Sequence, residues 1–335
     1  MEFQKENNIF IRLLIIIYFF ICTMSAFSAL AQPRRYQSTV NELQDISQAE
    51  VELIILGVAQ DAGYPQIGCY KKHCMPAWRD SSKQRLVTSL AVIDHKNKTK
   101  YLFEATPDIK KQLFQLHQLA ADENYSLRGV FLTHAHMGHY TGLMHFGHEA
   151  MASHNLPVYV MPKMKLFLAT NGPWEQLVKL NNIKLKSLQS GQKMILSDKL
   201  AVIPILVPHR DEYSETVAYK IIGPNKTVIF IPDIDKWQKW KLKVSEQIKL
   251  VNFAFLDATF FANGELANRD MSEVPHPFVE ESMELLSHLP NEDKAKVFFI
   301  HFNHSNPLLI ENSLAQQQVL KNGFKFAEEG MLLGL

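Results

Sequence analysis

Three histidines fall within six positions, at His134, His136 and His139, directly after the apolar run 129–133. Imidazole is the commonest protein ligand for transition metals, and no ordinary helix or strand face requires three at this spacing. Alternation at a strand end would point His134 and His136 the same way, and a turn at Gly138 would bring His139 beside them. This spacing predicts a metal site.

Three more potential ligands follow hydrophobic runs later in the chain. His209 follows 205–208, Asp233 follows 228–232 and His301 follows 297–300. Loops that leave a strand are where sites are commonly built. A donor set of five histidines and one carboxylate suits zinc, as one or two ions, and is also compatible with iron.

The segments that must position these ligands alternate between β-rich and helical patterns in two halves, with no repeat or hinge between them. This order favours an α/β class with layered sheets. Strands are expected over 51–57, 86–94, 100–104, 130–133, 158–161, 200–207, 216–222, 227–231, 250–257 and 296–301, and helices over 108–121, 140–151, 163–180, 279–289 and 312–321.

The first 31 residues have the pattern of a secretory leader. Lys5 and Arg12 precede the apolar run 13–22, and Ala29-Leu30-Ala31 offers a cleavage site between small residues. We therefore expect a signal peptide over 1–31, a linker over 32–50, a domain over 51–335, and export to the periplasm. Cleavage would leave no stable membrane insertion, whereas an uncleaved leader would act as an N-terminal anchor.

Composition limits the classes of molecule that we expect the protein to bind. The net charge is +1 and no arginine-rich face appears, which disfavours nucleic acid because binding its phosphates depends on Lys and Arg. Hydrophobic residues make up 47% of the chain, enough for a large core. We expect a small-molecule or peptide-derived substrate.

The ligand pattern resembles the metallo-β-lactamase superfamily, whose signature is a His-x-His-x-Asp-His loop followed by a His, an Asp and a final His on successive strand ends. The resemblance implies a four-layer αββα sandwich over about 51–330. Glu104 occupies the place of the acidic residue that orients the histidine loop in the family. By this match the first metal site is His134, His136 and His209, and the second is His139, Asp233 and His301, with Asp233 bridging the two.

Other segments resemble particular branches of that superfamily. Residues 56–66, 139–143 and 301–307 are similar to the branch of the pyrroloquinoline quinone biosynthesis B protein. The segment 256–260 resembles the ribonuclease Z branch, and His276 falls where that branch has an active-site histidine. These matches imply a branch and leave the substrate open.

The sequence departs from the family pattern at Gly138, which replaces the loop aspartate. This removes one ligand of the second metal and the group that orients the attacking water. Either the second site is empty and one metal acts alone, or a carboxylate reaches it from elsewhere. We hypothesise that Asp61 or Asp257 supplies that carboxylate, the alternative being that each is an ordinary turn or strand-end residue.

Cys69 and Cys74 are the only cysteines beyond the leader. Relatives carry a structural zinc on closely spaced cysteines in this loop, usually with a distant histidine, so His73 or His276 would complete such a site. A disulfide between Cys69 and Cys74, or two free thiols, are the alternatives in an exported protein.

These features favour an exported metal-dependent hydrolase, in which a metal-bound hydroxide attacks an ester, amide or phosphodiester. The catalytic candidates are Asp233, Asp61, Asp257 and His276. An iron-dependent oxidoreductase related to quinone-cofactor biosynthesis is the alternative enzyme. A catalytically silent protein that binds a metal or small ligand is the alternative outside enzymes.

Overall fold

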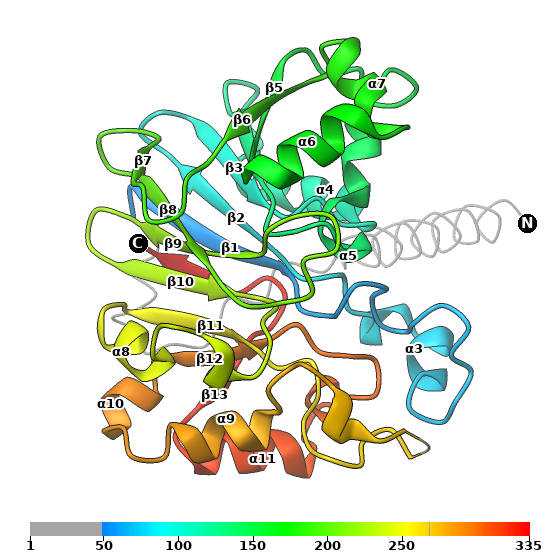
Figure 1. The fold of residues 1–335 in the computed structure, drawn as a ribbon, viewed down its shortest axis with the longest axis vertical. Coiled ribbons are helices and arrows are strands. Elements are labelled where there is room, and N and C mark those ends of the chain that lie inside the picture. The colour runs from blue at the N-terminus through cyan, green and yellow to red at the C-terminus, as the bar shows by residue number, and fades with distance from the viewer. Residues whose placement is uncertain (1–48, 268) are drawn as a thin grey trace, which may run out of the picture. The chain divides into compact units, whose positions relative to one another are not determined.

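A computed structural model describes residues 49–267 and 269–335, which form two seven-stranded sheets with helices around them (Figure 1). The predicted leader (1–31) and nearly all of the predicted linker (32–50) lie outside these residues. No described helix combines the length and the apolar character needed to cross a membrane. The two flanked sheets confirm the expected α/β sandwich.

The first sheet has the order β14-β1-β2-β3-β4-β5-β6, so the last strand of the chain pairs with the first. Its strands are β1 (Val51–Gly57), β2 (Ser89–Asp94), β3 (Thr99–Phe103), β4 (Ser126–Phe131), β5 (Leu156–Val160), β6 (Ile183–Ser187) and β14 (Leu332–Gly334).

The second sheet has the order β13-β12-β11-β10-β9-β8-β7. Its strands are β7 (Met194–Ile195), β8 (Ala201–Leu206), β9 (Val217–Ile222), β10 (Thr227–Ile231), β11 (Phe253–Asp257), β12 (Val297–Ile300) and β13 (Lys325–Phe326).

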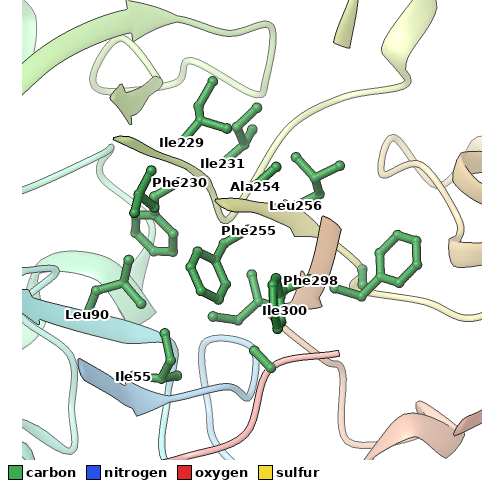
Figure 2. Close-up of a cluster of buried hydrophobic side chains, with 14 of the residues drawn as sticks. Ile55, Leu90, Ile229, Phe230, Ile231, Ala254, Phe255, Leu256, Phe298 and Ile300 are labelled. Carbon is green, nitrogen blue, oxygen red and sulfur yellow. The ribbon is translucent and has the colours of Figure 1, made fainter. Parts of the chain in front are cut away.

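The alternation of side chains along each strand explains the layers. In β1, Leu53 and Ile55 belong to the core between the sheets, whereas Ile54 and Leu56 pack in a separate core on the helix side. Both faces are apolar because both are covered. Figure 2 shows Ile55 and Leu90 of the first sheet facing Phe230 and Phe255 of the second.

Helices cover the outer face of each sheet (Figure 1). The helix-side core of the first sheet includes apolar residues from α4, η2, α6 and α7. The core between the sheets continues through the second sheet to apolar residues of α8, α9 and α11. The helices are α3 (Met75–Arg79), η1 (Ser81–Lys83), α4 (Ile109–Leu119), α5 (Met137–Tyr140), η2 (Thr141–Phe146), α6 (Pro162–Thr170), α7 (Trp174–Lys179), η3 (Trp237–Lys239), α8 (Val244–Lys249), η4 (Met271–Glu273), α9 (Val279–Leu285), α10 (Asn291–Lys294), η5 (Pro307–Leu309) and α11 (Leu314–Lys321).

Within each sheet, the strands that precede the predicted ligands run in the same direction. β1 and β3 are both antiparallel to β2, and β4 is parallel to β3. In the second sheet β8 and β10 are both antiparallel to β9, and β11 and β12 continue parallel to β10. Backbone pairing of Ala59 with Phe302 joins the loops that follow β1 and β12. The carboxyl ends of these strands therefore open onto one edge.

Two expected helices differ in the structure. The single helix expected over 163–180 is two, α6 and α7, separated at Gly172-Pro173. Proline has no N–H for the helix ladder and disfavours helical backbone at the preceding residue, so the apolar periodicity continues while the helix does not. The helix expected over 140–151 was also wrong, since Thr141–Phe146 is a 3-10 helix followed by a turn.

Glu329, in the loop before β14, accepts a hydrogen bond from the backbone N–H of Leu86, and burial raises its pKa from 4.5 to about 8. A carboxyl group whose pKa is higher when folded loses stability as the pH rises between these two values. We expect Glu329→Gln to remove that loss. Its Tm should exceed that of the wild type by roughly 3 °C at about pH 9 and match it at about pH 5.

Thermal denaturation across this pH range measures the effect, with the exposed neighbour variant Glu328→Gln as the control. Equal Tm values for Glu329→Gln and wild type at the alkaline end would contradict the assignment.

Candidate metal centre

The histidine loop after β4 contributes to two groups of potential ligands at the open edge. One group, here called the first cluster, has its ligand atoms within 4.8 Å of one another. It consists of His134, His136, His209 and Asp233. The other, the second cluster, meets the same limit and consists of Asp61, His139 and His301.

Asp233 joins the two clusters. Its Oδ2 lies 3.3 Å from His134 Nε2 and 3.8 Å from His139 Nε2, and its Oδ1 lies 3.2 Å from His209 Nε2. Burial alone would raise the pKa of Asp233, but the adjacent His209 and His276 hold it well below the usual value. Asp233 is therefore a buried anion that contacts histidines of both clusters.

Asp61 lies in the space left by the missing loop aspartate. A Cβ on Gly138 would come within 2.4 Å of both Asp61 Cα and Asp61 Oδ1. Residue 138 must therefore be glycine while Asp61 occupies this position. Asp61 Oδ1 lies 3.3 Å from His139 Nε2. Although burial opposes ionisation, the adjacent imidazole of His139 lowers the pKa of Asp61. The carboxylate thus reaches the second cluster from the loop after β1.

The other carboxylate considered for this role, Asp257, lies elsewhere. Its Oδ1 accepts hydrogen bonds from the backbone and hydroxyl of Thr259, and its Oδ2 accepts one from the Ile234 N–H and lies 2.9 Å from His276 Nδ1. Asp257 therefore groups with Asp233 and His276, and the structure places Asp61 alone of the two in the second cluster.

Neighbouring groups hold several histidines so that Nε2 faces the centre. His139 Nδ1 lies 3.3 Å from Glu104 Oε1, and His209 Nδ1 lies 3.2 Å from Asp235 Oδ1. His301 Nδ1 lies 3.0 Å from Thr259 Oγ1. Such outer contacts fix the orientation of metal-ligating imidazoles. Sequence reasoning placed Glu104 by resemblance and missed Asp235 and Thr259, although each lies two residues from a predicted site residue.

The remaining polar atoms test whether a metal fits. His139 Nε2, His301 Nε2, Asp61 Oδ1 and Asp233 Oδ1 are buried without a hydrogen-bond partner. Burial lowers the pKa values of His134 and His301, which favours the neutral form that binds metal. Against the effect of burial, Glu104 raises the pKa of His139 and Asp233 raises that of His209, so a bound ion would replace protons on these two rings. Unpaired buried nitrogen and carboxylate donors that converge in this way match the preferences of zinc. The residues fit one or two such ions.

His276 belongs to this centre. Its Nδ1 lies 2.9 Å from Asp257 Oδ2 and 3.1 Å from Asp233 Oδ1. Burial works against protonation, but the two carboxylates raise the pKa of His276 to about 10. Of the two histidines expected as alternatives for the cysteine site, His276 lies outside it because its ring is engaged here, whereas His73 lies beside the cysteines.

Cys69 and Cys74 lie in a separate group, here called the cysteine cluster. Its potential ligand atoms lie within 4.8 Å of one another, and its members are Cys69, His73, Cys74 and His304. The two thiols are not joined in a disulfide. Burial raises the pKa of Cys74 to about 12 and lowers that of His304 to about 4. Two thiols and two neutral imidazoles are a donor set for tetrahedral zinc. His304 was missed as a member because it is distant in sequence from the cysteines.

The rim of the first cluster carries charged side chains from the loop after β8. Glu212 Oε2 lies 3.0 Å from His136 Nε2, and Arg210 Nη2 lies 3.4 Å from the same nitrogen. Both side chains are about half exposed. Sequence reasoning missed both residues, because the one feature that marked them in the sequence was their closeness to His209.

Comparison with known proteins agrees with this architecture. Coenzyme PQQ synthesis protein B of Gluconobacter oxydans (strain 621H) is 24% identical over 306 residues, which cover 85% of this chain and 99% of that protein. The same protein of Acinetobacter baumannii (strain ACICU) is 24% identical over 312 residues, with 85% and 100% covered.

Solved structures show the same fold. Zn²⁺-bound PqqB from Methylobacterium extorquens superposes with a TM-score of 0.70 at 21% identity, covering 85% of this chain and 100% of that one. A diphosphatase from the PhnP family gives a TM-score of 0.58 at 20% identity, with 84% and 96% covered. A family model described as the β-lactamase superfamily domain matches residues 99–302, more than half of the chain. The chain therefore belongs to the metallo-β-lactamase superfamily.

Proposed function

We propose that this protein is an exported zinc-dependent hydrolase with two metal ions in its active centre. The observation that carries the proposal is the position of Asp61, which fills the space beside Gly138 and completes the second cluster. The first cluster would hold one ion, the second cluster the other, and Asp233 would serve both. When bound, such ions make water nucleophilic near neutral pH and stabilise charge on the reacting oxygen.

The residues of the chain have distinct tasks in this proposal. Asp61 has a side chain that is 23% exposed and ionised, so its carboxylate can accept a hydrogen bond from the attacking water and orient it. His276, protonated at neutral pH beside Asp257, would donate a proton to the leaving group from Nε2. Asp233 would hold the histidines of the first and second clusters at a fixed separation.

An anionic phosphodiester is the substrate class that we place first among the ester, amide and phosphodiester classes. Arg210 carries a half-exposed positive charge beside His136, at the rim of the first cluster, and is paired with Glu212 at 3.8 Å, so an anionic substrate would replace that carboxylate. Guanidinium groups bind phosphate oxygens well. The structural likeness to a diphosphatase of the PhnP family supports the same choice. A small-molecule or peptide-derived substrate is expected, rather than nucleic acid.

We also propose that the cysteine cluster holds a structural zinc ion. The proposal rests on the closeness of Cys69, His73, Cys74 and His304 and on the burial of both thiols. Export to the periplasm after removal of residues 1–31 is part of the same proposal, and it rests on the leader pattern alone.

A second candidate function is an oxidative step in the synthesis of a quinone coenzyme, with iron as the metal. It is favoured by the similarity to coenzyme PQQ synthesis protein B, which extends over 85% of this chain. Metal identity discriminates the two functions. A zinc-loaded protein that is active without oxygen would exclude the iron-dependent oxidase.

Elemental analysis of protein purified without added metal tests the proposed function, together with hydrolysis assays on phosphodiesters, esters and β-lactams. We expect His134→Ala to lose the first ion and His301→Ala the second, each with a fall in activity of about 100-fold or more. His154→Ala, an exposed histidine in a distant turn, should match the wild type. A fully loaded protein that hydrolyses none of the panel would instead identify a silent metal-binding member.

A further inference from the structure

Two segments of the chain each serve both the cysteine cluster and the active centre. The loop after β1 contributes Asp61 to the second cluster and then Cys69, His73 and Cys74 to the cysteine cluster. The loop after β12 contributes His301 to the second cluster and His304 to the cysteine cluster. Each segment therefore carries potential ligands of both the second cluster and the cysteine cluster.

The backbone joins these two segments directly. Gln60 N–H donates to the Phe302 carbonyl and Phe302 N–H donates to the Val58 carbonyl, both at 2.8 Å. Asp61 and His301 are the chain neighbours of Gln60 and Phe302. A shift of either segment therefore changes the separation of the two ligands.

Side chains extend the connection from this contact to the cysteine cluster. Tyr64 Oη donates to the carbonyl of His73 at 2.5 Å, and Trp78 Nε1 donates to the carbonyl of Cys69 at 2.7 Å. His304 Nδ1 lies 3.0 Å from Asn303 Oδ1, which leaves His304 Nε2 available as a metal ligand. The ring of His304 also lies beside that of His73, with 5.4 Å between centroids.

We propose that a metal ion in the cysteine cluster raises the metal affinity of the second cluster, by fixing the separation between the segments that carry Asp61 and His301. This inference rests on the metal sites of the proposed function and adds a coupling between them. The first cluster should respond less, because its ligands come from three other loops and only Asp233 contacts histidines of both clusters. Energetic coupling between sites is reciprocal, so filling the second cluster strengthens binding at the cysteine cluster by the same factor.

Zinc content measured across a series of buffered free zinc concentrations, under reducing conditions, tests the coupling. The double variant Cys69→Ser, Cys74→Ser should shift the second-cluster step to about 10-fold higher free zinc, while the first-cluster step shifts clearly less. His139→Asn identifies the second-cluster step in the wild type by removing it. The matched control is Ile67→Ser with Lys72→Ala, two exposed positions in the same loop.

The reciprocal effect uses cobalt in place of zinc. The thiolate-to-cobalt charge-transfer band reports the cysteine cluster alone, and its titration midpoint should rise about 10-fold in His139→Asn, which lies in neither shared segment. His304→Asn, with both thiols intact, should weaken the second cluster in the same direction as the cysteine double variant.

Two results would overturn the proposal. One is an unchanged second-cluster step in the cysteine double variant while its first cluster still fills. The other is an equal loss at both active-centre steps, which would make the cysteine cluster a general stabiliser of the fold. Failure of the proposed hydrolase function would appear differently, as metal titrations of the expected form in a protein without hydrolytic activity.

Discussion

Replacement of Asp233 by asparagine is expected to abolish zinc binding at both active-centre clusters. The carboxylate lies between them, with Oδ2 3.3 Å from His134 Nε2 and 3.8 Å from His139 Nε2. Even the outer partners of metal-bound histidines are worth 10- to 100-fold in affinity, so loss of a shared ligand should cost about 100-fold or more at each cluster. Hydrolytic activity should fall at least as far.

Asp235→Asn is the matched control for that result. Asp235 is two residues away and carries the same charge, and its side chain contacts the outer nitrogen of His209, at 3.2 Å, and Lys239. It should lose about 10-fold in affinity at the first cluster and leave the second unchanged. Metal content by elemental analysis and folding by circular dichroism separate the effects. Retention of two ions by folded Asp233→Asn would show that Asp233 is not a shared ligand.

Asp61→Asn should remove the ion from the second cluster and leave the first cluster filled. The amide keeps the shape of the side chain and loses the negative charge that lies 3.3 Å from His139 Nε2. We expect the affinity of the second cluster to fall about 100-fold, with a matching loss of activity. The zinc content of dialysed protein measures the first effect, and steady-state hydrolysis measures the second.

Moving the carboxylate back to the histidine loop provides a sharper test. Gly138→Asp alone should weaken the second cluster, because its Cβ would meet Asp61 Cα at 2.4 Å, and Gly138→Ala should reproduce that steric loss without a charge. Combining Gly138→Asp with Asp61→Gly removes the contacts with Asp61 Oδ1 and Cβ and returns a carboxylate to the histidine loop. The contact with the Cα of residue 61 remains, and the backbone freedom of a glycine there allows the loop after β1 to move away from it. The double variant should bind the second ion about 10-fold more tightly than either single variant. Additive losses would mean that the two positions are not equivalent.

Most of the strands were predictable from the sequence, because side-chain alternation and apolar runs are local signals, whereas their order within each sheet depends on tertiary pairing. β1, β10 and β12 fall close to their predicted ranges. β6, in which exposed lysines alternate with buried Ile183 and half-buried Leu185, was missed because it lacks an apolar run. β13 and β14 are too short to be recognised without the neighbours with which they pair.

The active-centre ligands were predictable to the extent that each follows a hydrophobic strand. Sequence alone suggested both Asp61 and Asp257 as replacements for the lost aspartate and could not choose between them. The choice depends on tertiary approach, since only the structure shows Asp61 against Gly138. His304 illustrates the same limit, because its partners Cys69 and Cys74 are more than two hundred residues away in the chain.

The active centre takes its first donor from Asp61, after the first strand, and its last from His301, after the twelfth. Contacts between such distant segments form late, because a long loop must close before they can stabilise the chain. A growing polypeptide therefore lacks the assembled centre until nearly all of the domain has been synthesised. For a chain that crosses a membrane unfolded, the zinc supply of the compartment in which folding finishes would decide which ions it acquires.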